Sequence, residues 1–296
     1  MTEQQGQPPI ECELPLPSGD GIDAVLGLLA TKRGIDLRDY QRETIARRLA
    51  LRIAATGTSD TTKYLGRLES DPSEPSKLLS VLLIPVTSFF RDPPVFRALQ
   101  DPVLPKLVTT FAASPLPLRA WVIGVATGEE AYSLAVLLSL ARAGQSEASF
   151  EVLATDIDSG VLETARKGSY PAEAAQAVPV EMRAGFLETA GPAVRVVERI
   201  RGCVRFCEHD LMGMRLAPKE AVIAVFQVVM LRNVLIYFDR RLQERAIERA
   251  AAVLVPGGIL VLGPAETLPP SMAIRFRPYP GIDPKLRIFI RTELGA

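Results

Sequence analysis

The sequence predicts an α/β fold in which a parallel sheet carries helices on both faces, with an all-helical domain before it and a small subdomain inserted into it. Residues 21–83 show only helix patterns, which indicates a helical domain without strands. From residue 119 onward, short apolar strands alternate with amphipathic helices, which is typical of a parallel sheet. Residues 171–201 break this alternation with short elements, so we expect the insertion there.

The first part of the chain divides into a tail and a series of expected helices. Residues 1–20 are rich in Pro, Gln and Gly and are expected to form a flexible tail. Gly34 and Gly57 mark the ends of the first two helices, because glycine readily adopts the left-handed conformation that ends a helix. The expected helices cover residues 22–34, 37–57, 61–70 and 75–85. A Pro-rich bridging segment, residues 84–118, leads to the second domain, residues 119–296.

The second domain is expected to alternate strands with helices. Ser159 should cap the second of its helices and Gly168 should end it. Strands are expected at residues 119–123, 150–158, 203–211, 221–231, 257–263 and 285–294, and helices at residues 129–144, 159–168 and 239–255.

Charge and hydropathy exclude several classes of protein. The chain has 34 Lys and Arg against 34 Asp and Glu, so its net charge gives no reason to expect a nucleic acid or an anionic membrane as partner. Its most continuous apolar run, residues 221–231, is too short to cross a bilayer. No signal peptide is visible and three cysteines make no disulfide framework. We therefore expect a cytoplasmic protein without membrane insertion, with a monomer as the simplest oligomeric state.

A metal site is not expected either. Cys203, Cys207 and His209 have the residue types of zinc ligands, but they lie in an expected strand. The two cysteines would then be about 13 Å apart at roughly 3.3 Å per residue. One zinc ion, with bonds of about 2.0–2.3 Å, cannot bridge that distance.

The loop after the first strand of the second domain is the candidate ligand site, because parallel sheets bind ligands beyond the carboxyl ends of their strands. This loop, residues 124–128, matches neither GxGxxG nor GxxxxGK[ST], and it contains no Lys. Glu129 and Glu130 follow it and would repel phosphates, which argues against a nicotinamide dehydrogenase. The loop therefore favours a ligand with a positive charge or an amino group. An alternative is that Glu129 only begins a helix, where acidic residues are favoured.

S-adenosylmethionine has these properties, since it carries a sulfonium, an ammonium group and a ribose but no phosphate. Asp156 ends the second strand of this domain, where a carboxylate can accept both ribose hydroxyls. The two carboxylates together favour S-adenosylmethionine over Glu129 as a simple helix start.

Six motifs in order resemble the CheR-type chemoreceptor methyltransferases, from about residue 21 to residue 290. They are VTSFFRDP (86–93), GVATGEEAYS (124–133), LATDID (153–158), ARKGSY (165–170), LRNVLIYFD (231–239) and PGGILVLGPAETL (256–268). The resemblance implies a Rossmann-like class I methyltransferase sheet. It also implies transfer of the methyl group of S-adenosylmethionine to glutamate side chains of a chemoreceptor or related signalling protein, giving glutamate methyl esters and S-adenosylhomocysteine.

The resemblance also implies roles for single residues. Arg91 and Tyr237 would serve the methyl transfer, and Thr87 and Arg91 would reach the cofactor, Arg91 near its carboxylate. Glu129 would bind the ammonium group and Asp156 the ribose. The other implied cofactor residues are Gly124 in the loop, Asp210 and Leu211 beside the adenine, and Arg232 and Asn233 at a strand end. No general base is needed, because a glutamate with a pKa near 4.3 is already ionised at neutral pH.

A basic segment in the helical domain matches the family's substrate helix, which is thought to meet the acidic methylated helices of receptors. Its arginines are Arg38, Arg42, Arg47, Arg48 and Arg52. The alternative from the residues alone is a solvated helix face. The insertion at residues 171–201 matches a subdomain that docks a receptor C-terminal peptide in some members.

Several positions depart from the family pattern. They are Pro85, Ala126, Ala131, Asp210, Gln227 and Leu231, where we expected Asn, Ser, Pro, Asn, Asp and Cys. The losses concern polar groups on the adenine side of the expected site, while the residues around the sulfonium are intact. The alternative function is therefore an S-adenosylmethionine-binding adaptor with weak catalysis in a chemosensory system.

Overall fold

The computed structural model describes residues 15–83, 85–114, 116–142, 149–221 and 225–293. It divides into two compact units, residues 1–82 and residues 83–296, which are described separately below. Most of the tail expected at residues 1–20 lies outside the described residues, and residues 19 and 20 already belong to the first helix.

The described part of the first unit is helical. Its helices are α1 (Gly19–Arg33), α2 (Arg42–Ala55), α3 (Thr61–Ser70) and α4 (Glu74–Leu83). The Ser18 hydroxyl accepts a hydrogen bond from the N–H of Gly21 at the start of α1, and Gly34 ends that helix with φ 71° as expected. The helices pack around fully buried apolar side chains such as Val25, Leu49 and Leu68, whose removal from water stabilises the unit.

Helix α2 begins five residues later than the pattern indicated, at Arg42 instead of residue 37. The carboxylate of Asp36 accepts hydrogen bonds from the backbone N–H and the guanidinium of Arg38. An aspartate that satisfies a backbone N–H two residues on favours a turn over a helix. Arg38 therefore lies in a turn before α2, and its expected place on the same helix as the other arginines is wrong.

The second unit contains a seven-stranded sheet that is parallel except at one edge. Its strands are β1 (Leu118–Ile123), β2 (Phe150–Asp156), β6 (Val204–Glu208), β7 (Phe226–Leu231), β8 (Leu254–Leu262), β9 (Phe276–Pro278) and β10 (Ile288–Arg291), in the order β6-β2-β1-β7-β8-β10-β9. Strand β10 pairs antiparallel with β8 and β9. The parallel Rossmann-like part is confirmed, and strand order reverses at β1, where such sheets bind ligands.

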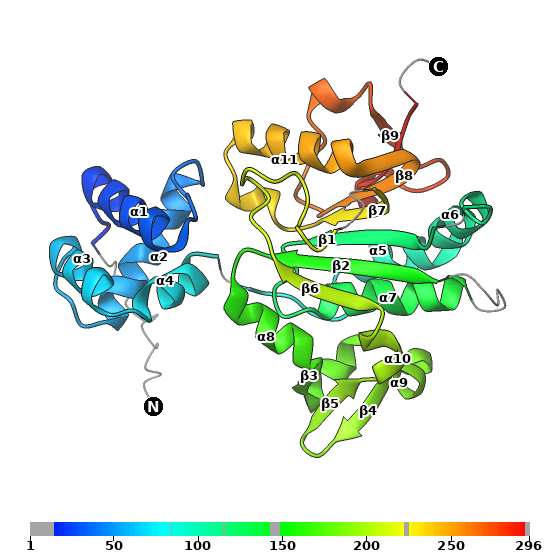
Figure 1. The fold of residues 1–296 in the computed structure, drawn as a ribbon, viewed down its shortest axis with the longest axis horizontal. Helices are drawn as coiled ribbons and strands as arrows, with labels where there is room; N and C mark the ends of the chain where they lie inside the picture. The colour runs from blue at the N-terminus through cyan, green and yellow to red at the C-terminus, as the bar shows by residue number, and fades with distance from the viewer. Residues whose placement is uncertain (1–14, 84, 115, 143–148, 222–224, 294–296) are drawn as a thin grey trace, which may run out of the picture. The chain divides into compact units, whose positions relative to one another are not determined.

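Helices cover both faces of the sheet (Figure 1). On one face lie α7 (Glu129–Ala141) and α8 (Ser159–Lys167), and on the other lies α11 (Arg240–Val253). Successive side chains of β1 point to opposite faces of the sheet. Ala120 and Val122 pack in the main apolar cluster on one face, while Trp121 contacts Phe226 on the other. Helix α8 is capped by Asp158, whose carboxylate accepts from the N–H of Gly160, and the expectation of Ser159 as cap is wrong.

The segment expected as a bridge, residues 84–118, contains a broken helix. Its parts are α5 (Pro93–Ala98), η1 (Leu99–Val103) and α6 (Leu104–Thr110), and Phe96, Leu104 and Leu107 are buried in the same cluster as α7. Short helical turns η3 (Leu235–Tyr237), η4 (Pro270–Met272) and η5 (Pro284–Leu286) complete the domain. No helix in the described ranges is long and apolar enough to span a membrane.

The irregular segment after α8 forms a separate three-stranded antiparallel sheet, β3-β5-β4, below the main sheet in Figure 1. Its elements are β3 (Ser169–Pro171), η2 (Ala172–Ala177), α9 (Val180–Phe186), β4 (Leu187–Ala190), β5 (Ala193–Val196) and α10 (Glu198–Arg201). The inserted subdomain thus begins at Ser169, two residues before the expected boundary.

Candidate active site

The loop between β1 and α7 is shaped by glycines at both ends. Gly124 has φ 68° and Gly128 has φ 101°, backbone conformations that residues with a side chain rarely adopt. A Cβ atom on Gly124 would overlap the side chain of Val234, and one on Gly128 would overlap Ala165. The loop therefore packs directly on the segment that follows β7 and on α8, which follows β2. This packing brings the carboxyl ends of β1, β2 and β7 together.

Asp156 ties this loop to the end of β2. Its Oδ2 accepts a hydrogen bond of 2.8 Å from the N–H of Ala126, and its Oδ1 accepts one of 3.0 Å from the N–H of Asp158. Burial raises the pKa of this carboxyl, against the effect of these backbone N–H groups. Each carboxylate oxygen can accept more than one hydrogen bond, so Asp156 keeps capacity for ligand hydroxyls.

The two adjacent glutamates have different surroundings. Glu129 is buried, and its Oε2 accepts a 2.7 Å hydrogen bond from the hydroxyl of Thr127. Among the ion pairs of the described residues, none involves Glu129, and burial raises the pKa of its carboxyl. A buried carboxylate without a basic partner in the protein is suited to a ligand cation.

Glu130 instead faces the interior and pairs with Arg232. Its Oε2 lies 2.5 Å from Nη1 of Arg232, whose side chain has 0% exposure. Nη2 of the same guanidinium lies 2.6 Å from Oδ2 of Asp92 and 3.2 Å from the carbonyl oxygen of Arg91. The side chain of Arg232 is thus engaged by the protein itself, and the implied role of this residue in cofactor binding stays a prediction.

The segment before α5 lies against the first turn of α7. The N–H of Phe90 donates to the hydroxyl of Ser133 at 2.9 Å, and that hydroxyl donates to the carbonyl of Glu129 at 2.7 Å. Arg91 is half-buried and its Nη1 donates to the carbonyl of Val86 at 2.7 Å. Thr87 lies four residues before Arg91 in the same segment and is half-buried.

The residues after β7 are held by a glutamate that the sequence analysis did not select. Oε1 of Glu266 accepts from the N–H of Leu235 at 2.8 Å, and Oε2 accepts from the N–H of Gly263 at 2.6 Å. Asn233 has φ 58° and Tyr237 ends the turn η3, both half-buried. Glu266 lies in the motif PGGILVLGPAETL, and that position was the available signal.

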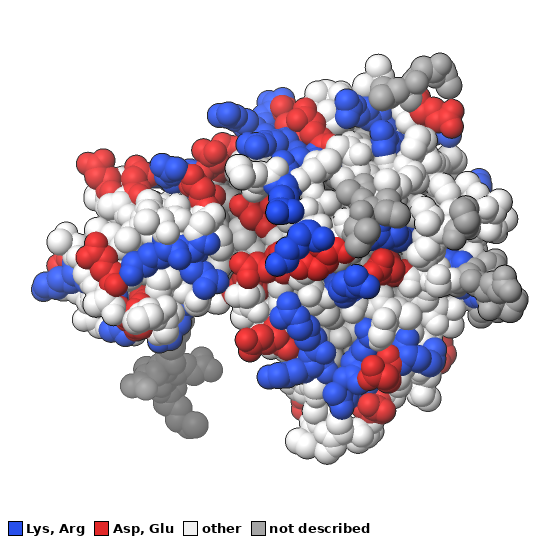
Figure 2. Space-filling model, in the orientation of Figure 1, with Lys and Arg blue, Asp and Glu red and all other residues white. Residues whose placement is uncertain are grey.

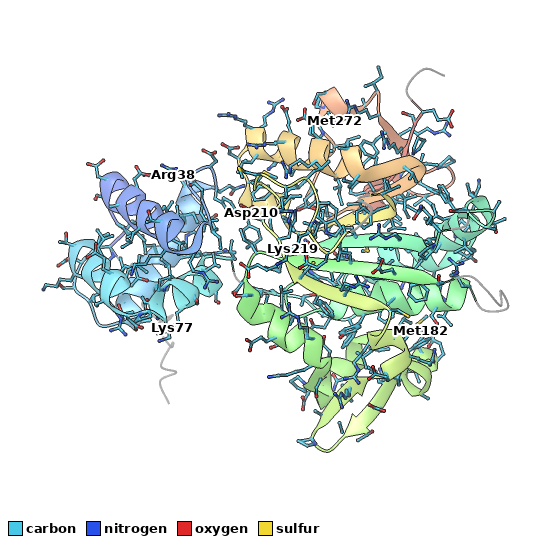
Figure 3. The ribbon with its side chains drawn as sticks, viewed as in Figure 1. Arg38, Lys77, Met182, Asp210, Lys219 and Met272 are labelled. Carbon is cyan, nitrogen blue, oxygen red and sulfur yellow. The ribbon has the colours of Figure 1, made fainter. Side chains whose placement is uncertain are left out.

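Asp210, labelled in Figure 3, and Leu211 follow β6, whose last residue pairs in register with Asp156 at the end of β2. The backbone N–H of His209 donates to the carbonyl of Asp156, and Oδ1 of Asp210 accepts from the N–H of Met212 at 2.8 Å. An asparagine oxygen could accept the same bond, so Asp210 preserves the local turn. Leu211 is buried.

One departure from the family pattern lies away from this site. Oε1 of Gln227 accepts a 2.8 Å hydrogen bond from the N–H of Arg119 near the start of β1. The carboxyl ends of these strands form the site, so Gln227 lies at the opposite end of β7. The expectation that this change alters the adenine side is wrong.

Two family models match this chain. The model described as "CheR methyltransferase, SAM binding domain" matches residues 85–281, and the model described as "CheR methyltransferase, all-alpha domain" matches residues 20–83. The chain belongs to the CheR methyltransferase family. Its second unit is the S-adenosylmethionine-binding domain of that family, which confirms the expected cofactor and fold class.

Curated relatives of the CheR chain differ in length and in name. A chemotaxis protein methyltransferase of Klebsiella aerogenes is 35% identical over 81% of this chain and 80% of its own. A probable biofilm formation methyltransferase, WspC of Pseudomonas aeruginosa, is 31% identical over 81% of this chain and 55% of its own. An uncharacterized 104.1 kDa protein of Rhodobacter capsulatus is 34% identical over 86% of this chain, which spans only 26% of it.

Among solved structures, the chain resembles CalS10, an amino pentose methyltransferase from Micromonospora echinaspora with SAM bound. The TM-score is 0.32 and the identity 17%, over 60% of this chain and 52% of that one. This likeness concerns the fold alone.

The arginines of the helical unit have unequal surroundings. Arg52 makes two 2.7 Å bonds to the fully buried carboxylate of Glu74, and Arg48 bonds the carbonyl of Leu82. Arg42 pairs with Asp23, and Arg38 with Asp36. Arg47 is exposed on α2, and among the described residues no ion pair involves it. Figure 2 shows that basic and acidic side chains are mixed over the visible surface of this unit.

Proposed function

We propose that this CheR chain transfers the methyl group of S-adenosylmethionine to glutamate carboxylates of a chemoreceptor or a related signalling protein, giving glutamate methyl esters. The observation that supports it most directly is Glu129, a buried carboxylate that makes no ion pair with the described residues, at the point where strand order reverses. The names of the chemotaxis methyltransferases at 33–35% identity favour receptors as substrates.

In this proposal the carboxyl ends of the strands hold the cofactor. Glu129 accepts from its ammonium group and Asp156 from its ribose hydroxyls. Thr87 and Arg91 approach its carboxylate from the segment before α5. Gly124, Asp210, Leu211 and Asn233 line the remaining walls, since they lie on the loops that follow β1, β6 and β7.

The chain's own part in the reaction is positioning and charge matching. When bound, S-adenosylmethionine would supply the methyl group of its sulfonium to a substrate carboxylate oxygen, and its sulfur would become the neutral thioether of S-adenosylhomocysteine. Arg91 can orient that carboxylate through a bidentate contact, and it cannot act as a base. Tyr237, at the end of η3, would face the methyl group and limit its approach to one direction.

The test is to incubate the protein with methyl-labelled S-adenosylmethionine and a cytoplasmic receptor fragment, and then treat the labelled fragment with alkali. We expect volatile methanol, because only a carboxyl methyl ester releases it under these conditions. A fragment whose modified glutamates are replaced by alanine is the matched control and should take up no label. Base-stable label, or cofactor binding without any label, would favour the adaptor function instead.

Arg47, an exposed arginine of α2, provides a second test of the receptor as substrate. Replacing Arg47 with glutamate should raise the KM for an acidic receptor fragment about 3- to 10-fold at low salt, because charges at the rim of an interface steer association. The difference should shrink as salt screens the charges. Affinity for S-adenosylhomocysteine should not change. Arg277→Glu, at an exposed position on β9, is the matched control, and an equal KM effect from it would remove α2 from substrate binding.

A further inference from the structure

We propose that Arg232, fixed by Glu130, is a positioning residue that holds Arg91 in place for the cofactor. The inference deepens the proposed function, since it rests on Arg91 reaching the cofactor. It assigns the second glutamate of the doublet a role distinct from that of Glu129.

The guanidinium of Arg232 is buried at the centre of a network of charged side chains. Two carboxylates, those of Glu130 and Asp92, lie 2.5 and 2.6 Å from its terminal nitrogens, and its guanidinium carbon lies 5.5 Å from the ring centre of Phe96. A buried ion pair of this kind is seldom more stabilising than apolar residues of similar volume. Stability alone therefore does not explain why three charged side chains meet here, whereas a requirement for fixed geometry does.

What the network fixes is a short backbone segment. Phe90 has φ 50° and Asp92 has φ 61°, so both neighbours of Arg91 adopt the left-handed conformation that non-glycine residues rarely adopt. Such a conformation persists only where surrounding contacts hold it. Ser133 holds the N–H of Phe90, and Arg232 holds both the carboxylate of Asp92 and the carbonyl of Arg91.

The partners on the other side of the network belong to α7. Glu130 and Ser133 lie in the first two turns of that helix, and Glu129 begins it. The network therefore connects the residue proposed to bind the ammonium group with the residue proposed to bind the carboxylate. Because these two groups sit on one amino-acid moiety of the ligand, their separation must be constant. Arg232, the residue after β7, joins Glu130 of α7 to Asp92 and the carbonyl of Arg91, beside the link that Ser133 makes to Phe90.

Coupling between residues gives the test, measured as affinity for S-adenosylhomocysteine by calorimetry. Arg91→Ala and Arg232→Lys should each weaken binding about tenfold, the second because lysine keeps the charge but cannot contact both carboxylates in a fork. If Arg232 acts through Arg91, the double variant should bind no more weakly than Arg91→Ala alone. Effects that multiply to about 100-fold, or an Arg91→Ala variant that binds as well as the wild type, would overturn the proposal.

Controls separate positioning from folding and from the proposed reaction. Arg119→Lys changes another buried arginine, paired with Glu151 near the start of β1, and should leave affinity unchanged. If Arg232→Lys does not fold, Glu130→Gln tests the same coupling from the other partner, with a thermal unfolding curve for each variant. The binding measurement needs no receptor. Coupling without methyl ester formation would contradict only the proposed function, and ester formation without coupling would contradict only this inference.

Discussion

Replacing Glu129 with glutamine is expected to weaken the binding of S-adenosylmethionine and S-adenosylhomocysteine by at least about 30-fold. Removing one partner of a buried charge pair costs about 2–5 kcal/mol, and each 1.4 kcal/mol is about tenfold in affinity. Glutamine keeps the size of the side chain and can still accept from the hydroxyl of Thr127. The loss should therefore come from the missing charge, and titration calorimetry of each ligand would measure it.

The same substitution should not destabilise the protein without ligand. Burial raises the pKa of Glu129, so the folded protein binds this proton more tightly than the unfolded chain does. The contribution of such a group to stability is complete below its unfolded pKa and is lost as the pH rises through its folded pKa. At neutral pH the ionised carboxylate is thus a cost without ligand, and Glu129→Gln should melt at the same temperature as the wild type or higher.

The affinity for the cofactor should rise with pH, whereas the contribution of Glu129 to stability without ligand falls with pH. Only the ionised carboxylate attracts the ammonium group, so wild-type affinity should decline as the pH is lowered from about 8 to about 5. Asp156 is half-buried, and desolvation raises the pKa of its carboxyl as well, so part of the decline should remain in the Glu129→Gln variant. A variant that binds as tightly as the wild type, with an unchanged pH profile, would remove Glu129 from the cofactor site.

The sequence predicts the parallel part of the fold well because its signals are local. Apolar runs, glycine stops and the alternation of strands with helices identify β1, α7, β2 and α8 to within a few residues. Strand β9 was missed, because three residues that end in Pro278 show no alternation, and its pairing with β10 is decided by tertiary contacts. The late start of α2 follows from the Asp36 side chain, which competes with the helix for a backbone N–H.

The site shows a similar division between local and long-range information. Strand ends indicate where Asp156 and Glu129 lie, because chain direction fixes which end of a parallel strand carries the loop. Residue types alone do not distinguish Glu129 from its neighbour Glu130, since the difference is a contact with Arg232, 102 positions later in the chain. Glu266 was missed for the same reason. Its partners include residues of the loop after β7, more than 30 positions earlier.

Replacing Glu266 with alanine should destabilise the second unit by about 3 kcal/mol and impair methyl transfer as well. The substitution leaves at least the N–H groups of Leu235 and Gly263 without their acceptors in a buried place, and each such group costs about 1–3 kcal/mol. For a domain of this size, about 3 kcal/mol corresponds to a fall in Tm of about 6–12 °C. Calorimetric or circular-dichroism melting would measure the shift.

The comparison of two substitutions separates the roles of this carboxylate. Glu266→Gln keeps one acceptor oxygen, so its melting temperature should lie between those of the wild type and of Glu266→Ala. Glu248→Ala, an exposed position on α11, is the control for removing a glutamate and should change Tm little. Because Glu266 holds the backbone between Asn233 and Tyr237, both variants should lose turnover well below their melting temperatures. Normal turnover in a destabilised Glu266→Ala protein would show that this loop keeps its geometry without the carboxylate, and that Glu266 supports the fold only.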